Sequence, residues 1–211
     1  MKIINHEYRE KTYNLAEVCA FKKTKELFGG LSNMASGFPL VVNGVNILTS
    51  EALYQACRFP HLPDVQRTII AQKSPMSAKM KSKPYRADSR ADFEYKKVVI
   101  MRWCLRVKLA QNFIRFSQLL ESTENKEIVE NSHKDRFWGA VPTKEDKNLL
   151  VGANVLGGLL KQLRREYYEN RLTNLPSLLY VEPPTINGFL LFDEPIRAVD
   201  ERENFVRLSM Q

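Results

Sequence analysis

Histidine and cysteine are both scarce in this sequence, with three of each among 211 residues. Cys19, Cys57 and Cys104 are odd in number and widely spaced, so they form no C-x-x-C pair and indicate no disulfide framework. None of the histidines has another histidine or a cysteine at metal-ligand spacing. We therefore expect neither a metal nor another cofactor, and we expect any catalysis to use carboxylates, lysines and backbone dipoles.

Long apolar runs are also missing. No run approaches the roughly 18 residues that a membrane-spanning helix needs. The first 14 residues have no apolar core typical of a secretory signal. The composition, 44% hydrophobic and 27% charged, is ordinary for a globular protein that buries one core. We expect a soluble cytoplasmic protein without a membrane partner.

The charge is strongly one-sided. The formal net charge is +8 and the isoelectric point is near 9.4. This balance favours anionic partners such as phosphorylated sugars, dinucleotides or nucleic acid. A solvated basic surface explains the same charge equally well, so the charge alone identifies no partner.

Turn and cap signals predict most of the regular structure. Residues 18–21 suit a short strand, and Asn43-Gly44 between two β-rich runs predicts a hairpin, because both turn residues tolerate positive φ. Thr49-Ser50 and Ser74-Pro75 are typical helix starts. The helices expected from caps and periodicity cover residues 51–59, 63–73, from 75, 92–112, 113–121 and 156–168.

The longest of these helices has a clear apolar face. Its members follow the i, i+3, i+7, i+11 spacing: Val98, Met101, Leu105 and Leu109. Three basic residues are expected mainly on other faces: Arg102, Arg106 and Lys108.

The last forty residues differ in character, with strand-like runs at 178–181 and 189–192. A short strand or turn is also expected near Ile128-Val129. We predict an α+β, helix-dominated fold with a small β-hairpin region. Residues 1–170 would form the domain and 171–211 an appended C-terminal segment packing on it.

Glu51 lies in the first turn of a predicted helix, where the positive end of the helix dipole stabilises a carboxylate. Tyr54, Gln55 and Arg58 follow at i+3, i+4 and i+7 and share or border its face. An ionised carboxylate beside hydrogen-bond donors can stabilise a cationic sugar or activate water. Acidic residues also occur in first turns for stability alone, and taken by itself Glu51 fits that explanation better.

Six short segments occur in a fixed order along the chain, and they begin at Phe28, Ser50, Pro75, Arg90, Asp135 and Gly152. Together they resemble the motifs of the NADAR (YbiA-like) family. That family shows an F-x-x-L/F-S-N-F loop, an S-E-H-Y-x-Q-A helix start, and P-x-x-A-K, R-x-D-W, D-x-F/Y-W-G and G-x-N-x-L-G segments. The resemblance covers roughly residues 17–168 and implies a YbiA-like single domain.

The sequence departs from the family pattern at four positions. Met34 replaces an aromatic residue, Ala52 replaces a common histidine, Arg58 stands for a frequent lysine, and Phe93 stands for a tryptophan. No carboxylate is lost by these changes. We expect them to alter the shape of the pocket and the substrate preference.

The resemblance implies a hydrolase of N-glycosidic bonds. One branch of the family cleaves ribosylamino-pyrimidine phosphates, which are intermediates of riboflavin synthesis. Another removes ADP-ribose from guanine and reverses DNA modification by DarT-type toxins. In both substrates, C1 of ribose is attached to an exocyclic amine on a pyrimidinone ring.

Two mechanisms follow from that shared bond, and the sequence leaves both open. The furanose can open to an imine that a lysine intercepts as a Schiff base, for which Lys79, at the family's A-K position, is the candidate. Alternatively, Glu51 or Asp135 stabilises an oxocarbenium-like state and orients water. Without the resemblance, Lys79 is a solvated helix lysine and Asp135 a turn residue.

The resemblance also implies a set of substrate-binding residues. They are Phe28, Gly29, Gly30, Ser32, Asn33, Tyr54, Gln55, Arg58, Trp138, Gly139 and Asn154. Trp138 offers a flat face for a base or is a core residue, and Arg58 suits a phosphate. Asn33 and Asn154 are expected to orient substrate or to bridge loops. Gly29-Gly30 and the start of the helix near residue 155 would present N–H groups to phosphate, although turns need glycine without any ligand.

Three functions remain open. The first is an ADP-ribosyl-guanine N-glycosidase acting on nucleotides or DNA, an antitoxin whose partner is a toxin encoded nearby. Its DNA-facing stripe would contain Lys79, Lys81, Lys83, Arg86 and Arg90, unless these form a solvated loop. The second is an N-glycosidase of ribosylaminopyrimidine phosphates, and the third is a non-catalytic module that binds ADP-ribose or NAD derivatives. The oligomeric state is left open.

Overall fold

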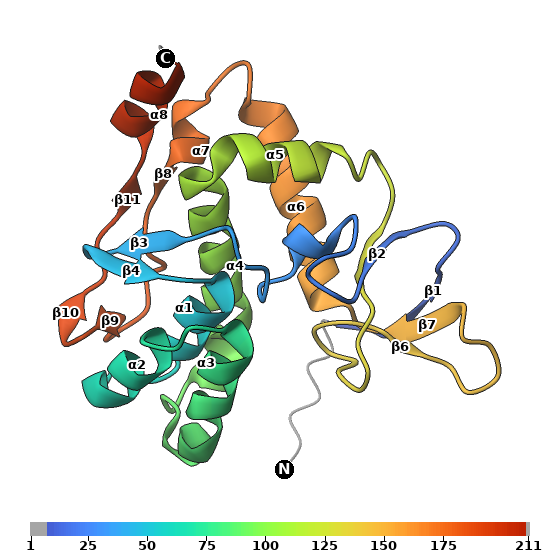
Figure 1. The fold of residues 1–211 in the computed structure, drawn as a ribbon, viewed down its shortest axis with the longest axis horizontal. Coiled ribbons are helices and arrows are strands. Elements are labelled where there is room, and N and C mark those ends of the chain that lie inside the picture. Colours follow the sequence, from blue (N-terminus) through green and yellow to red (C-terminus); the bar gives the residue numbers. More distant parts are fainter. Residues whose placement is uncertain (1–7, 210–211) are drawn as a thin grey trace. The chain divides into compact units, whose positions relative to one another are not determined.

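The computed structural model describes residues 8–209 (Figure 1). Residues 1–7, which belong to the N-terminal stretch considered above, and residues 210–211 of the C-terminal segment lie outside the described range. The chain divides into two compact units. Unit 1 contains the described residues up to Ser32 together with residues 118–165. Unit 2 contains residues 33–117 together with those from Glu166 onward.

Unit 1 contains a three-stranded antiparallel sheet and a parallel strand pair. The sheet has the order β1 (Lys11–Asn14), β7 (Leu149–Gly152), β6 (Val141–Pro142), and the pair joins β2 (Cys19–Phe21) to β5 (Ile128–Glu130). Tyr13, Val129, Ala140 and Leu150 form one buried cluster of this unit. The short 3-10 helix η1 (Gly29–Leu31) follows β2.

Unit 2 is built around its longest helix. Its helices are α1 (Ser50–Ala56), α2 (Pro63–Ile70), α3 (Pro75–Ser82), η2 (Lys83–Asp88), α4 (Phe93–Gln111), α7 (Pro176–Leu179) and α8 (Arg202–Ser209). Its antiparallel strand pairs are β3 (Leu40–Val42) with β4 (Val45–Ile47), β8 (Tyr180–Val181) with β11 (Val199–Asp200), and β9 (Leu190–Leu191) with β10 (Glu194–Pro195). Helices α1, α2 and α3 pack against one another, and α4 contacts α1, α7, β3, β8 and β11. Two further helices, α5 (Phe113–Glu121) and α6 (Val155–Asn170), contribute residues to both units.

Several local predictions are confirmed. Asn43 and Gly44 have φ of 51° and 77° and join β3 to β4, as a tight hairpin requires. Thr49 caps α1 by accepting a hydrogen bond from the Ala52 N–H, and Ser74 caps α3 in the same way. The four apolar residues predicted on one face of α4 are all buried.

Other elements differ from the sequence-based expectation. Residues 176–179 form a helical turn that starts at Pro176, so the predicted strand keeps only Tyr180–Val181. Strands β1, β6 and β7 and helix α8 were not expected. Lys108, expected on a face of α4 other than the apolar one, is fully buried, because the rings of Phe38 and Phe116 cover it.

The fold class is α+β with helices dominant and small sheets, as predicted. None of the helices between residues 8 and 209 has the length and hydrophobicity of a membrane span.

Candidate active site

The predicted site residues fall into two sets, one in each unit. Unit 2 contains Asn33, Glu51, Tyr54, Gln55, Arg58 and Lys79. Unit 1 contains Phe28, Gly29, Gly30, Ser32, Asp135, Trp138, Gly139 and Asn154.

Glu51 is a buried carboxylate with only 6% of its surface exposed. It lies in the first turn of α1, where the positive end of the helix dipole favours negative charge. Its own N–H donates to the Asn33 carbonyl at 3.0 Å, and its Oε1 accepts from Gln55 Nε2 at 2.9 Å. The backbone and one neighbouring amide therefore hold the carboxylate in a defined position.

Asn33 brings a buried acceptor to the same region. Its side-chain nitrogen contacts the Met101 sulfur at 2.7 Å, and only 4% of the residue is exposed. Its Oδ1 is buried and has no hydrogen-bond partner in the part of the chain that the structure describes. Because buried acceptors are rarely left unpaired, this oxygen is well suited to accept an N–H or O–H from a ligand.

Gln55 is fully engaged within the protein. Its Nε2 donates to Glu51, and its Oε1 accepts from Ser82 Oγ at 2.9 Å. Ser82 Oγ also lies 2.8 Å from the Lys79 carbonyl oxygen. In the structure both ends of the Gln55 amide contact other residues of the protein, and the expected contact of Gln55 with substrate stays a prediction.

Ser82 was missed in the sequence. Its signal is the i, i+4 spacing from Ala78, since these two residues are the buried positions of α3. Lys79 lies between them and is half-buried. The Lys79 side chain makes no hydrogen bond or ion pair with any other residue of the described range 8–209, so its amine is available to a ligand.

Tyr54 and Arg58 meet at the ring of Phe93. The Arg58 guanidinium lies 4.2 Å from the ring centroid and its Nε donates to Ser89 Oγ at 2.7 Å. Arg58 and Phe93, two of the four departures from the family pattern, are thus in direct contact. Burial raises the pKa of Tyr54 well above its usual value, with a further contribution from Glu51, and burial lowers the pKa of Arg58. The tyrosine is therefore a neutral hydroxyl near the carboxylate.

In unit 1, Asp135 organises a loop. Its Oδ1 accepts hydrogen bonds from the N–H groups of Phe137 and Trp138, at 3.0 and 2.9 Å. Trp138 is half-buried and packs edge-to-face against Phe137, with ring centroids 5.0 Å apart. The carboxylate thus fixes the backbone that presents the indole.

The start of α6 is joined to the same loop and to β5. Asn154 Oδ1 accepts from the Glu130 N–H at 3.1 Å, and its Nδ2 donates to the Ile128 carbonyl at 2.8 Å. A side chain on Gly157 would collide with that carbonyl oxygen, so the close approach requires glycine. The Asn154 side chain therefore joins the start of α6 to β5, and its expected role in orienting substrate stays a prediction.

The N–H groups at the start of α6 were expected to bind phosphate. In the structure, the N–H groups of Val155 and Leu156 donate to the carbonyls of Phe137 and Trp138, each at 3.0 Å. These two donors are occupied and do not offer an anion site.

The Phe28–Ser32 segment forms η1 and a tight turn. A side chain on Gly29 would collide with the backbone of Lys23 and Thr24, so the glycine is required by packing. Glu26 accepts from the N–H groups of Lys22 and Lys23, at 2.9 and 3.0 Å, and closes the same turn. Ser32 is buried at its end.

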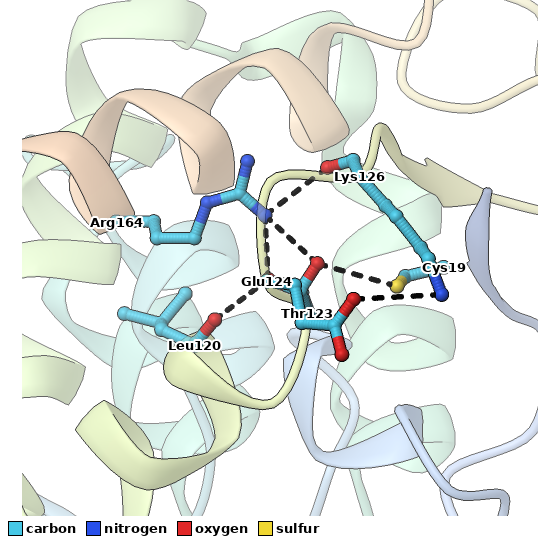
Figure 2. Close-up of polar contacts among 6 residues, drawn as sticks. All are labelled: Cys19, Leu120, Thr123, Glu124, Lys126 and Arg164. Carbon is cyan, nitrogen blue, oxygen red and sulfur yellow. Dashed lines mark hydrogen bonds and ion pairs between the residues drawn. The ribbon is translucent and has the colours of Figure 1, made fainter.

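Figure 2 shows a polar cluster of unit 1 that is centred on Arg164. Its Nη1 donates to Thr123 Oγ1 at 2.6 Å and to the carbonyls of Thr123 and Lys126 at 3.3 and 3.1 Å. Cys19 Sγ lies 3.6 Å from the same Thr123 carbonyl. Since Arg164 is only 8% exposed, this buried guanidinium holds the turn between α5 and β5.

A cavity of about 670 Å³ occurs elsewhere in unit 2. Its lining comes from the β3–β4 hairpin, Gln111 and residues 197–204. Gln111 bonds the N–H and carbonyl of Val41 and the Glu201 carboxylate, at 2.8, 2.9 and 2.8 Å. Because none of the sequence-predicted site residues lines this cavity, it is a weaker candidate than the surroundings of Glu51.

A family model for the NADAR domain matches residues 20–167. The chain therefore belongs to the NADAR family, as the six motifs predicted. The NMR structure of the E. coli protein YbiA is 30% identical, with a TM-score of 0.62, and the match covers 74% of this chain and 87% of that one. The predicted YbiA-like character is thereby confirmed.

Two curated relatives are riboflavin biosynthesis proteins. One, from Vibrio vulnificus, is 32% identical over 157 residues, which are 74% of this chain and 40% of that protein. The other, the chloroplastic protein PYRR of Zea mays, is 31% identical over 162 residues, or 71% of this chain and 25% of that protein. The chain spans less than half the length of either relative. Family membership supports the N-glycosidase type of hydrolase that the motifs predict.

Proposed function

We propose that this chain is an N-glycosidase that hydrolyses the bond between C1 of a ribose and an exocyclic amine on a guanine-like pyrimidinone ring. The observation that carries the proposal is Glu51, a buried carboxylate held by Gln55 and the Asn33 backbone in the first turn of α1. In a site with little water, such a carboxylate stabilises positive charge on the anomeric carbon strongly.

The reaction needs one water and one proton transfer. The water oxygen bonds to C1, the C1–N bond breaks, and its electron pair stays on the exocyclic nitrogen. Glu51 takes a proton from the water and returns it to that nitrogen. Asn33, whose carbonyl accepts from the Glu51 N–H, also has an unpaired buried Oδ1 that would orient a hydroxyl or N–H of the substrate.

The alternative route uses Lys79 as the nucleophile. Its amine would attack the opened sugar, form an imine and release the base, after which water regenerates the lysine. Borohydride reduction during turnover separates the two routes. A covalent sugar adduct that is absent from Lys79→Ala supports the imine, whereas no adduct in an active wild type supports the carboxylate route.

As substrate we propose ADP-ribosylated guanine in DNA or nucleotides. Exposed basic side chains gather on and around α3 and η2, at Lys73, Lys81, Lys83 and Arg86. They would contact phosphates, and binding of DNA would weaken steeply with salt. Arg90, predicted in this stripe, does not belong to it, because it is buried, pairs with Asp92 and donates to the Asn187 carbonyl at 2.8 Å.

The ribosylaminopyrimidine phosphates are the second candidate, favoured by the names of the two riboflavin biosynthesis relatives. Arg58 would be the phosphate contact, because Phe93 and Ser89 hold its guanidinium in place.

One assay decides between the substrates. Equal concentrations of the chain are incubated with an ADP-ribosylated guanosine oligonucleotide and with the pyrimidine ribosylamine phosphate. We expect ADP-ribose from the first, with turnover falling as salt rises. If only the pyrimidine ribosylamine phosphate were cleaved, with release of ribose 5-phosphate, the protein would instead be assigned to the riboflavin-type branch of the family. Tight ADP-ribose binding with no release from either would favour the non-catalytic module.

The antitoxin role adds a cellular prediction. Co-expression of the chain with a DarT-type toxin should restore growth and lower the level of ADP-ribosylated guanine in DNA. The variant Glu51→Gln, which keeps an acceptor for Gln55, should fold normally and fail to protect.

A further inference from the structure

Three buried side chains form a continuous hydrogen-bond chain from α1 to the end of α3. It runs from Glu51 Oε1 to Gln55 Nε2, 2.9 Å, and from Gln55 Oε1 to Ser82 Oγ, 2.9 Å. It ends at the Lys79 carbonyl oxygen, 2.8 Å from Ser82 Oγ. The exposed fractions of Glu51, Gln55 and Ser82 are 6, 4 and 0%, so water competes little with these bonds.

The direction of donation is fixed when Glu51 is ionised. A carboxylate only accepts, so the Gln55 amide must turn its N–H toward Glu51 and its Oε1 toward Ser82. The Ser82 hydroxyl then donates to Gln55. This is the arrangement in the structure.

The same atoms also satisfy the protonated form of Glu51 if the amide turns over. The protonated carboxyl then donates to Gln55 Oε1, and Gln55 Nε2 donates to Ser82 Oγ. The Ser82 hydroxyl, now an acceptor from Gln55, donates to the Lys79 carbonyl, which already lies within hydrogen-bonding distance. The terminal torsion of glutamine is broad and roughly two-fold, so both amide orientations are accessible.

A serine hydroxyl is suited to the end of such a chain because it both donates and accepts. Alanine would do neither, and one end of the buried amide would be unsatisfied in either protonation state. The Lys79 carbonyl is needed only when Glu51 is protonated, so the Ser82 hydroxyl has an acceptor for its one proton in both states.

We propose that Ser82 is a positioning residue that, through Gln55, keeps Glu51 correctly placed in both its ionised and its protonated form. The inference rests on the proposed function, in which Glu51 receives a proton from the attacking water and then delivers it to the exocyclic nitrogen. The hydrogen-bond chain also connects Glu51 to the backbone carbonyl of Lys79 on α3.

The test compares three variants on the substrate that the wild type cleaves. In Ser82→Ala, kcat should fall about 10- to 100-fold while KM changes less than about threefold, because the chain acts on the chemical step. Ser82→Thr, which keeps the hydroxyl, should recover most of kcat. Ser77→Ala removes an exposed hydroxyl from the same helix and should leave kcat and the melting temperature unchanged.

A mutant cycle with Gln55→Met shows whether Ser82 acts through Gln55. If it does, Gln55→Met/Ser82→Ala is no slower than Gln55→Met alone. The proposal would be overturned if the losses in kcat of the two single variants multiplied in the double variant. It would also be overturned by a kcat of Ser82→Ala within about twofold of wild type. The cycle also decides the matter if the threonine variant fails to fold.

Failure of the proposed function is recognised separately, because it appears as a wild type that releases no sugar from either substrate. Side-chain amide exchange of Gln55, followed by NMR, still tests the chain itself. We expect slow exchange in the wild type and faster exchange in Ser82→Ala. Equally fast exchange in the wild type and in Ser82→Ala would show that the hydrogen-bond chain does not protect the Gln55 amide.

Discussion

The polar side chains of the family motifs do different work in the two units. In unit 2, Glu51 and Gln55 bond mainly to other side chains, and the acceptor of Asn33 is unpaired. In unit 1, Asp135 and Asn154 bond to the backbone of their own loops and of β5. Residues that are equally prominent in the motif pattern therefore differ in their partners, which are mainly side chains in unit 2 and backbone groups in unit 1.

The difference teaches how to weigh a carboxylate in a motif. A carboxylate that accepts hydrogen bonds from two backbone N–H groups stabilises a turn whether or not a substrate is present. A buried carboxylate that is hydrogen-bonded to side chains adds little to the stability of the fold, because an apolar residue at the same position would avoid the cost of desolvating the charge. We infer that Glu51 is kept for chemistry and that Asp135 mainly positions Trp138.

The largest effect on stability is expected in unit 1, where polar groups hold the fold. Arg164→Ala removes the donor to the buried Thr123 Oγ1 and to the carbonyls of Thr123 and Lys126, and the free energy of unfolding should fall by about 2–4 kcal/mol. Urea denaturation measures this fall. Lys161→Ala is the matched control on the same helix, since its ion pair with Glu127 is partly exposed and is worth about 1 kcal/mol or less. If both variants lost the same free energy of unfolding, the buried contacts of Arg164 would be no more stabilising than the partly exposed ion pair of Lys161.

The next effect concerns a buried charge in unit 2. Burial lowers the pKa of Lys108 from 10.5 to about 7. Between these pH values the unfolded chain holds a proton that the folded chain lacks, so stability rises with pH across this window and is flat below it. Lys108→Met should abolish the rise and stabilise the protein by about 1–3 kcal/mol at pH 7.

The gap between Lys108→Met and the wild type should narrow toward pH 10, and chemical denaturation across this range measures it. Lys96→Met, a half-buried lysine on the same helix, is the control. A less stable Lys108→Met at pH 7 would mean that the contacts of the ammonium with Phe38 and Phe116 outweigh desolvation.

The smallest effect is expected at Asp135. Asp135→Asn keeps the oxygen that accepts from Phe137 and Trp138, so kcat should fall less than about 10-fold. A steady-state assay on the cleaved substrate measures it. A loss as large as that of Glu51→Gln would make Asp135 a catalytic carboxylate and erase the contrast between the units.

The sequence predicted local structure best where one residue type satisfies one local requirement. The caps at Thr49 and Ser74 and the Asn43-Gly44 turn are examples, because their hydrogen bonds and φ values involve near neighbours. The motif order gave the family and the fold class. These predictions needed no knowledge of long-range contacts.

The missed features depend on partners far away in the chain. Lys108 is buried because Phe38, seventy residues earlier, covers it. Ser82 matters through Gln55, and β7 exists through its pairing with β1 near the start of the chain. The helical turn at Pro176 shows that an apolar run does not by itself distinguish a strand from a short helix.

The most direct measurement is the rescue of Glu51→Ala by formate, which can replace the missing carboxylate in the space left behind. If Glu51 carries the chemistry, Glu51→Ala should lose about 1,000-fold or more in kcat, and added formate should restore part of it. Asp135→Ala and Lys79→Ala should show no formate-dependent gain. A Glu51→Ala turnover within about tenfold of wild type, without formate, would contradict the account.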